Sequence, residues 1–170
     1  MKRIYVLILF ISSLLFGSSE YKVKAVYVYN IAKFVQWQND SFKTKNCNFN
    51  IAILGHDDFG NDIDILEGKK VLTHPIVVTK IKRLDNIEKF QIIYISKSEM
   101  GKLSYIKKKL DKKRVLLISD MKDFALKGGH VEIQNVGKKL KMVINNHSAL
   151  RNDIHFSSKI LKLATIVETE

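Results

Sequence analysis

Acidic and histidine side chains that could do chemistry follow two of the apolar runs in this sequence. Gly55-His56-Asp57-Asp58 comes directly after the run 49–54, and Asp120 ends the run 115–119. In open sheets with helices on both faces, ligands bind beyond the carboxyl ends of the strands, so these residues could share one site. Asp57 or Asp58 could also cap a following helix, because a carboxylate there accepts backbone N–H groups of the first turn. The cap interpretation is favoured.

Motifs of three common catalytic or metal-binding classes are absent from the sequence. The Gly-x-Ser-x-Gly turn of serine hydrolases does not occur. Gly68-Lys69 is followed by Lys70 and has no glycine five positions earlier, so it is not a phosphate-binding loop. The five histidines are scattered, without the i, i+4 pairs or cysteine partners that bind zinc. The sequence therefore predicts a protein that is not an enzyme and has no cofactor and no metal site.

An alternation of apolar strands and helices must position these residues. Strands are predicted at Phe49–Leu54, Pro75–Ile81, Phe90–Ile95 and Val115–Ser119. Helical segments are predicted at Tyr21–Trp37, Asp57–Leu66 and Ser98–Leu110, the last capped by Ser98. This order predicts an α/β fold: a single domain of three layers with a mixed, mostly parallel, Rossmann-like sheet.

The C-terminal part follows a different pattern. His130–Val136 and Lys139–Asn145 alternate polar and apolar residues around Gly137, which predicts an antiparallel hairpin at the edge of the sheet. A final helix is predicted because apolar residues recur at helical spacing. These residues are Phe156, Ile160, Leu163, Ala164 and Val167.

The charge balance limits the kinds of partner. The chain of 170 residues holds 29 Lys and Arg against 17 Asp and Glu, and its net charge of +12 favours anionic partners. The run Lys107-Lys108-Lys109 with Lys112-Lys113-Arg114 is read as a solvated helix end, with a nucleic-acid or lipid patch as the alternative. No aromatic residue lies among these lysines, so we expect no nucleic-acid partner.

The first nineteen residues have the layout of a secretory signal peptide. Lys2 and Arg3 precede the apolar run Ile4–Phe16, and Gly17-Ser18-Ser19 supplies small residues for cleavage after Ser19. Residues 1–19 are thus predicted to be removed, and residues 20–170 to form the exported domain. An uncleaved anchor is the alternative, although the run is shorter than the roughly 20 residues that span a bilayer. Cys47 is the only cysteine, so no disulfide can form within the chain.

The predicted first helix is apolar on most of its surface. Its apolar residues leave only a narrow polar stripe of Asn30, Lys33 and Gln36. Such a helix lies either in the core or against another subunit. We therefore expect a homodimer held without a covalent bond.

The string Tyr21-Lys-Val-Lys-Ala-Val-Tyr-Val-Tyr-Asn-Ile-Ala-Lys-Phe-Val-Gln-Trp37 resembles the opening helix of the YfiR family. Further matches follow in the family's order over nearly all of residues 20–167. They are Ile51-Ala-Ile-Leu-Gly55, Ile93-Tyr-Ile-Ser96, Leu117-Ile-Ser-Asp120, Phe124-Ala125, Gly128-Gly129, Ile144-Asn145 and Ser157-Ser158-Lys-Ile-Leu-Lys-Leu-Ala164. Lys139 and Lys141 stand where arginines are usual in the family, and lysine lacks bidentate anion geometry.

The resemblance implies a periplasmic regulator that represses an inner-membrane diguanylate cyclase of the YfiN kind. Repression would lower cyclic-di-GMP and biofilm formation, and an outer-membrane lipoprotein of the YfiB kind would relieve it. The alternative is a periplasmic small-ligand binding module that feeds a sensor kinase or a transporter. We assign the contact surface to six residues of the first helix and the hairpin, with a structural role as the alternative for the two asparagines. They are Asn30, Lys33, Trp37, Lys139, Lys141 and Asn145.

Removal of the leader is the first testable prediction. We expect the exported protein to begin near Glu20, because the small residues Gly17 and Ser19 occupy the −3 and −1 positions of the predicted cleavage after Ser19. Amino-terminal sequencing of the periplasmic fraction measures this. An intact Met1 in the membrane fraction would contradict it.

Overall fold

A computed structural model describes residues 20–38, 42, 47–56, 59–137 and 139–168. The predicted leader and the proposed caps Asp57 and Asp58 lie outside these residues. None of the helices within the described ranges is long and apolar enough to cross a membrane.

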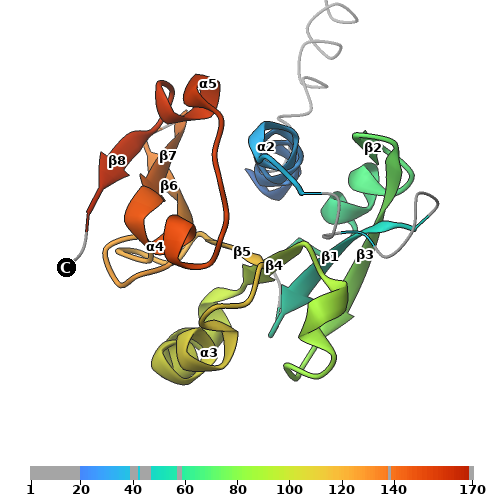
Figure 1. Cartoon of the computed structure of the whole chain (residues 1–170), viewed down its shortest axis with the longest axis horizontal. Coiled ribbons are helices and arrows are strands. Elements are labelled where there is room, and N and C mark those ends of the chain that lie inside the picture. The colour runs from blue at the N-terminus through green and yellow to red at the C-terminus, as the bar shows by residue number, and fades with distance from the viewer. Residues whose placement is uncertain (1–19, 39–41, 43–46, 57–58, 138, 169–170) are drawn as a thin grey trace, which may run out of the picture.

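An eight-stranded sheet runs through the molecule in the order β2-β3-β1-β4-β5-β6-β7-β8 (Figure 1). The strands are β1 (Phe49–Leu54), β2 (Lys70–Val71), β3 (His74–Ile81), β4 (Ile92–Ile95), β5 (Leu116–Ser119), β6 (Val131–Val136), β7 (Lys139–Asn145) and β8 (Thr165–Val167). Strands β3, β1, β4, β5 and β6 pair in parallel, whereas β2–β3 and β6–β7 pair antiparallel. The predicted α/β fold with a mixed, mostly parallel sheet and an antiparallel hairpin is confirmed.

Helices cover both faces of this sheet. Helix α2 (Glu20–Phe34) lies over one face, and α3 (Leu103–Leu110), preceded by the 3-10 turn η4 (Lys97–Lys102), lies over the other (Figure 1). The alternation along β1 divides the core accordingly, since Ile51 and Ile53 pack in the α2 layer while Ala52 and Leu54 pack in the α3 layer. The remaining turns and helices are short. They are η2 (Asp62–Leu66), η3 (Ile87–Lys89), α4 (Asn146–Arg151) and α5 (Ser158–Leu161).

The first helix lies in the core of its own domain. Ala25, Val28, Ile31 and Ala32 are almost completely buried against the sheet. The helix ends at Phe34, before the predicted Trp37, and Val35 instead forms a β-bridge with Phe156. Its apolar character is therefore explained by the fold of one chain.

Two local predictions of the helix signals were wrong. The segment 57–66 contains only the 3-10 turn η2 among its described residues. Ser98 does not cap a helix: it lies inside η4, where its Oγ accepts a hydrogen bond of 2.9 Å from the backbone N–H of His56. This long-range hydrogen bond to the segment that follows β1 replaces the expected cap.

The predicted C-terminal helix is present but too long in the prediction, and the predicted position of the hairpin at the sheet edge was wrong. Helix α5 covers only four residues, and Thr165–Val167 forms β8, which pairs in parallel with β7. Three successive β-branched residues favour a strand there. Ile160 is buried, but Leu163 is 76% exposed, so the helical stripe has no surface to pack against.

A hydrogen-bonded loop, residues 120–130, joins β5 to β6. Strands β5 and β6 pair at only two positions, Ile118 with Val131 and Ser119 with Glu132. The loop between them is held by the buried carboxylate of Glu132, which accepts hydrogen bonds of 3.1 Å from the backbone N–H groups of Asp123 and Ala125. These side-chain hydrogen bonds therefore fix the loop between β5 and β6, where few residues of the two strands pair.

Gly129 tests this packing. A Cβ at Gly129 would overlap the ring of Phe124, which is completely buried, so Gly129→Ala should lower the free energy of unfolding by about 1–3 kcal/mol. Gly101→Ala is the matched control because a Cβ at Gly101 would meet no atom within 4 Å. Urea unfolding measures both variants. Equal midpoints would show that the loop tolerates the methyl group.

Candidate functional site

A buried lysine attaches the first helix to the carboxyl edge of the sheet. The side chain of Lys24 is 0% exposed, and its Nζ donates to Oδ2 of Asp120 at 2.6 Å and lies 2.5 Å from Oε1 of Glu20. The more exposed Lys97 reaches the same Asp120 oxygen at 3.2 Å. The Asp120 carboxylate is therefore occupied by ion pairs with two lysines and is not open to a ligand.

The electrostatics of this cluster keep its groups charged. Burial alone would lower the pKa of Lys24, but its hydrogen bonds to Asp120 and Glu20 raise that pKa above the ordinary value. Burial alone would raise the pKa of Asp120, but Lys24 and then Lys97 lower it. Neither group is tuned to exchange protons near neutral pH, so the cluster positions α2 and is unsuited to acid–base chemistry.

The expected site at the strand ends is divided in the structure. Gly55 has a φ of +95°, and a Cβ there would lie 2.6 Å from the Oγ of Ser98, so the chain passes close to η4 at this point. A pocket of about 490 Å³ opens beside Gly55 and His56 and is lined by Lys80, Lys82 and Lys102 among others. Asp120 does not line it, and Asp57 and Asp58 lie outside the described residues.

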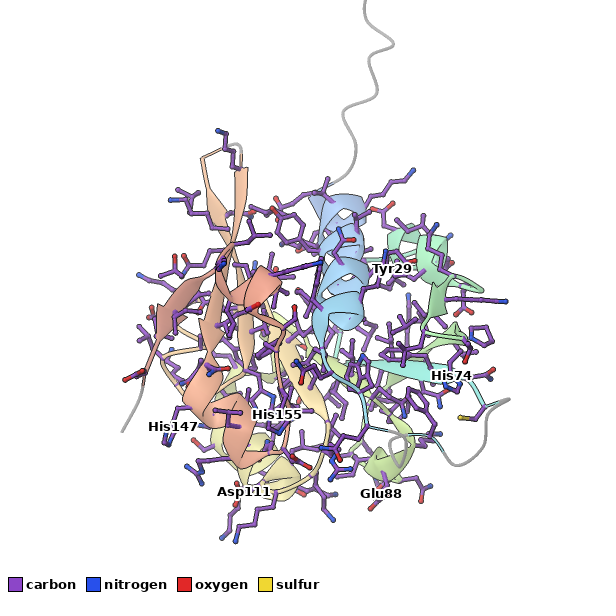
Figure 2. The ribbon with its side chains drawn as sticks, turned by 45° about the horizontal axis from the view of Figure 1, so that its top comes forward. Tyr29, His74, Glu88, Asp111, His147 and His155 are labelled. Atoms are coloured by element: carbon purple, nitrogen blue, oxygen red, sulfur yellow. The ribbon has the colours of Figure 1, made fainter. Side chains whose placement is uncertain are left out.

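The histidines are placed separately, as Figure 2 shows for His74 and His147 at opposite sides of the molecule. His74 Nδ1 lies 2.8 Å from the carbonyl oxygen of Cys47, whose thiol is partly exposed. Within the described ranges, no three His, Cys, Asp or Glu side chains are grouped so that they could hold a metal ion.

A groove of about 760 Å³ brings together two of the six residues assigned to a contact surface. It lies between α2, β7 and the segment 160–165. The groove is lined by Tyr27, Asn30, Ile31, Phe34, Leu140, Lys141, Met142, Ile160, Lys162, Leu163, Ala164 and Thr165. The hydroxyl of Tyr27 donates to the carbonyl of Leu140 at 3.0 Å and fixes α2 against β7. Asn30 and Lys141 therefore face a common groove although they are far apart in the sequence.

The other four assigned residues lie elsewhere. Lys33 is exposed with its Nζ 5.3 Å from the centroid of the Tyr29 ring, and Lys139 is exposed near the hairpin turn. Trp37 packs edge-on against Phe49, and its Nε1 donates to the carbonyl of Ala32 at 2.7 Å.

Asn145 is fully buried. Its Oδ1 accepts from the N–H of Ser148, which caps α4, and its Nδ2 donates to the carbonyl of Ala125 at 2.9 Å. These contacts are structural, and they separate Asn145 from the exposed lysines of the same strand.

Sequence reasoning missed Lys24 and the lining of the groove by the segment 160–165. The sequence did carry a signal that Lys24 is buried in an ion pair: it follows Glu20 by four residues and lies between apolar residues on an otherwise apolar face of the helix. The segment 160–165 had none, because the predicted helix continued through residues 162–165, whereas α5 ends at Leu161 and β8 begins at Thr165. Exposed apolar side chains lie beside the groove here: Leu163 is 76% exposed and Ile166 is 42% exposed.

Comparison with known families agrees with the motifs that these elements carry. The model of the YfiR/HmsC-like family matches residues 21–165, from α2 to the start of β8. The chain belongs to the YfiR/HmsC-like family. YfiR/HmsC-like proteins are periplasmic regulators of cyclic-di-GMP signalling, and the family is a regulatory one and not known for catalysis. No curated protein matches the chain at a significant level.

Lys24 provides a prediction about stability. Lys24→Ala should lower the free energy of unfolding by about 3 kcal/mol, because it leaves the buried carboxylate of Asp120 without its closest cation. Lys22→Ala is the control on the same helix, where Lys22 is exposed and the change should stay within about 0.5 kcal/mol. Chemical unfolding at neutral pH measures both.

The double variant Lys24→Met with Asp120→Asn separates charge from packing. It removes the buried pair together and should recover most of the loss, because replacing both ions of a buried pair by neutral groups of similar volume is often neutral for stability. A double variant as unstable as Lys24→Ala would contradict the electrostatic explanation.

Proposed function

We propose that the protein binds the periplasmic part of a membrane diguanylate cyclase and holds that enzyme inactive, so that cyclic-di-GMP and biofilm formation fall. Membership of the YfiR/HmsC-like family over residues 21–165 carries this proposal. An outer-membrane lipoprotein would relieve the repression. The regulator acts by binding and needs no cofactor.

The groove between α2 and β7 is the surface that we assign to the cyclase. Protein interfaces combine an apolar centre with a polar rim. The groove has this composition, with Ile31, Phe34 and Met142 among its apolar lining and Asn30, Lys141 and Lys162 among its polar lining. Strand β8 lies at the margin of the groove, and Thr165 at its start lines it.

The hairpin lysines extend this surface. Lys139 and Lys141 are both exposed and lie on the same side of β7, since alternate residues of a strand share a face. An acidic surface on the cyclase would be attracted to them. The affinity for the cyclase should therefore depend on the charge of these two lysines.

Charge reversal tests the assignment. Lys139→Glu with Lys141→Glu should weaken binding to the cyclase's periplasmic domain at least tenfold, because like charges across an interface repel. The thermal midpoint should stay close to that of the wild type, since both side chains are exposed. Titration calorimetry and thermal unfolding measure the two quantities.

Lys70→Glu with Lys89→Glu is the control pair. Both lysines are exposed, and neither lines the groove, so the same change in net charge should leave affinity nearly unchanged. Equal losses in the two double variants would remove the hairpin from the proposed contact surface. Capture of a sensor kinase or a transporter subunit in place of a cyclase, by cross-linking in cells and mass spectrometry, would favour the alternative function.

We also propose that the protein is a homodimer without a covalent link. Among the described strands β8 pairs only with β7, so its other edge, on a strand that carries the exposed Ile166, gives a second copy a place to pair. Light scattering should give twice the monomer mass, with and without reductant. A monomer at micromolar concentration would contradict the dimer, and a dimer that reductant dissociates would assign the link to Cys47.

A further inference from the structure

Another concave site lies on the α3 side of the sheet, away from the groove. It is a pocket of about 510 Å³ between α3, α4 and the loop that joins β5 to β6. Figure 2 shows Asp111 and His147, which both line it, at the same corner of the molecule. Nothing in the proposed cyclase contact uses this pocket.

Positive charge converges on the pocket from three separate elements. Lys107 and Lys108 come from α3, Lys127 from the loop and Arg151 from α4. Asp111 is the one carboxylate in the lining, and its Oδ1 lies 3.6 Å from a guanidinium nitrogen of Arg151. Four cations against one carboxylate create a positive potential that a concave surface focuses.

Backbone carbonyls position two of these cations. The ammonium of Lys107 donates to the carbonyl of Lys127, and it passes beside Gly128, where a Cβ would lie 3.1 Å from that nitrogen. Ser148 Oγ donates to the carbonyl of Gly128 at 2.7 Å, and Glu132 fixes the loop from its other side. The ammonium of Lys127 likewise donates to the carbonyl of Lys122 at 3.3 Å, so bonds to neutral carbonyls position both lysines without neutralising them.

The floor beneath the cations is neutral and hydrogen-bonded. Asn152 lines the pocket, and its Oδ1 accepts from the N–H of Lys112 at 3.0 Å while its Nδ2 lies 3.0 Å from Nε2 of His130. His130 is completely buried, and burial lowers its pKa to about 3, so it is uncharged at neutral pH. The positive charge therefore stands at the rim, where an anion can reach it.

We propose that this pocket binds a phosphoryl group, carried either by a small soluble anion or by a lipid headgroup. Lysine ammonium groups bind phosphate as point charges, and an arginine adds directed N–H donors, which is the set of groups found here. The volume lies within the range of about 300–1,000 Å³ of small-molecule sites. Ser104 adds a hydroxyl to the lining.

Pyrophosphate is the soluble probe. Titration calorimetry of the mature chain should give saturable 1:1 binding that weakens as salt rises. Lys127→Ala with Arg151→Ala should reduce the affinity about tenfold or more, since both side chains are exposed cations of the pocket. Lys108→Gln, an exposed position on α3, repeats the test if the double variant fails to fold.

Lys70→Ala with Lys89→Ala is the matched control, because it removes the same net charge far from the pocket lining. The control should keep the affinity within about twofold. Equal losses in pocket and control variants would overturn the proposal, since binding would then follow net charge alone.

Vesicles separate the two sources of the phosphoryl group. The site would be assigned to lipid headgroups if the protein co-sediments with phosphatidylglycerol vesicles but not with phosphatidylcholine vesicles. The pocket variant should then lose this co-sedimentation, and the control variant should keep it. Pyrophosphate binding without vesicle binding would assign it to a soluble anion. Absence of binding to both probes at low salt would overturn the proposal.

Discussion

The ion pair between Lys24 and Asp120 fixes the register of the first helix on the sheet. An isolated ion costs several kcal/mol to bury, and the cost is offset only where its partners are correctly placed. Lys24 meets this condition in one rotation of α2, with Asp120 at 2.6 Å and Glu20 one turn earlier. Rotation or sliding of α2 would separate the charges. The same rotation turns Tyr27, Asn30 and Phe34 toward β7, so the groove depends on a contact outside it.

The sheet could be predicted from sequence because its central strands are short apolar runs that end at polar or glycine residues. Strand β1 was predicted with its observed bounds, and β3, β4 and β5 were predicted within two residues. The C-terminal segment failed for a physical reason. Phe156, Ile160 and Leu163 have helical spacing, but the partner that decides the conformation of Thr165–Val167 is β7, a contact far along the chain. Periodicity describes local burial and carries no information about such pairing.

The candidate site was predicted only in part, because here too the deciding contacts are tertiary ones. Asn30 and Lys141 were assigned to one surface, and the structure places both in the groove. Trp37 and Asn145 belong to the motifs that identify the family, yet their polar groups bond the carbonyls of Ala32 and Ala125. A sequence motif does not separate residues that meet a partner from residues that satisfy buried backbone groups. Lys24 shows the converse, since a lysine in a helix is usually solvated and only tertiary contacts identify a buried one.

Asn145 also connects the two faces of the protein. It ends the strand that carries Lys141 into the groove, and its side chain bonds the loop that carries Lys127 into the basic pocket. A chain of bonded residues is not in itself coupling between sites, because coupling requires an element with two arrangements that each ligand favours differently. The loop here has one well-bonded arrangement: Glu132, Asn145 and Ser148 each hold it, and Gly129 packs closely on Phe124. These bonds involve the backbone of the loop and not the exposed cations, so we expect an anion at the rim to leave the loop and the groove unchanged.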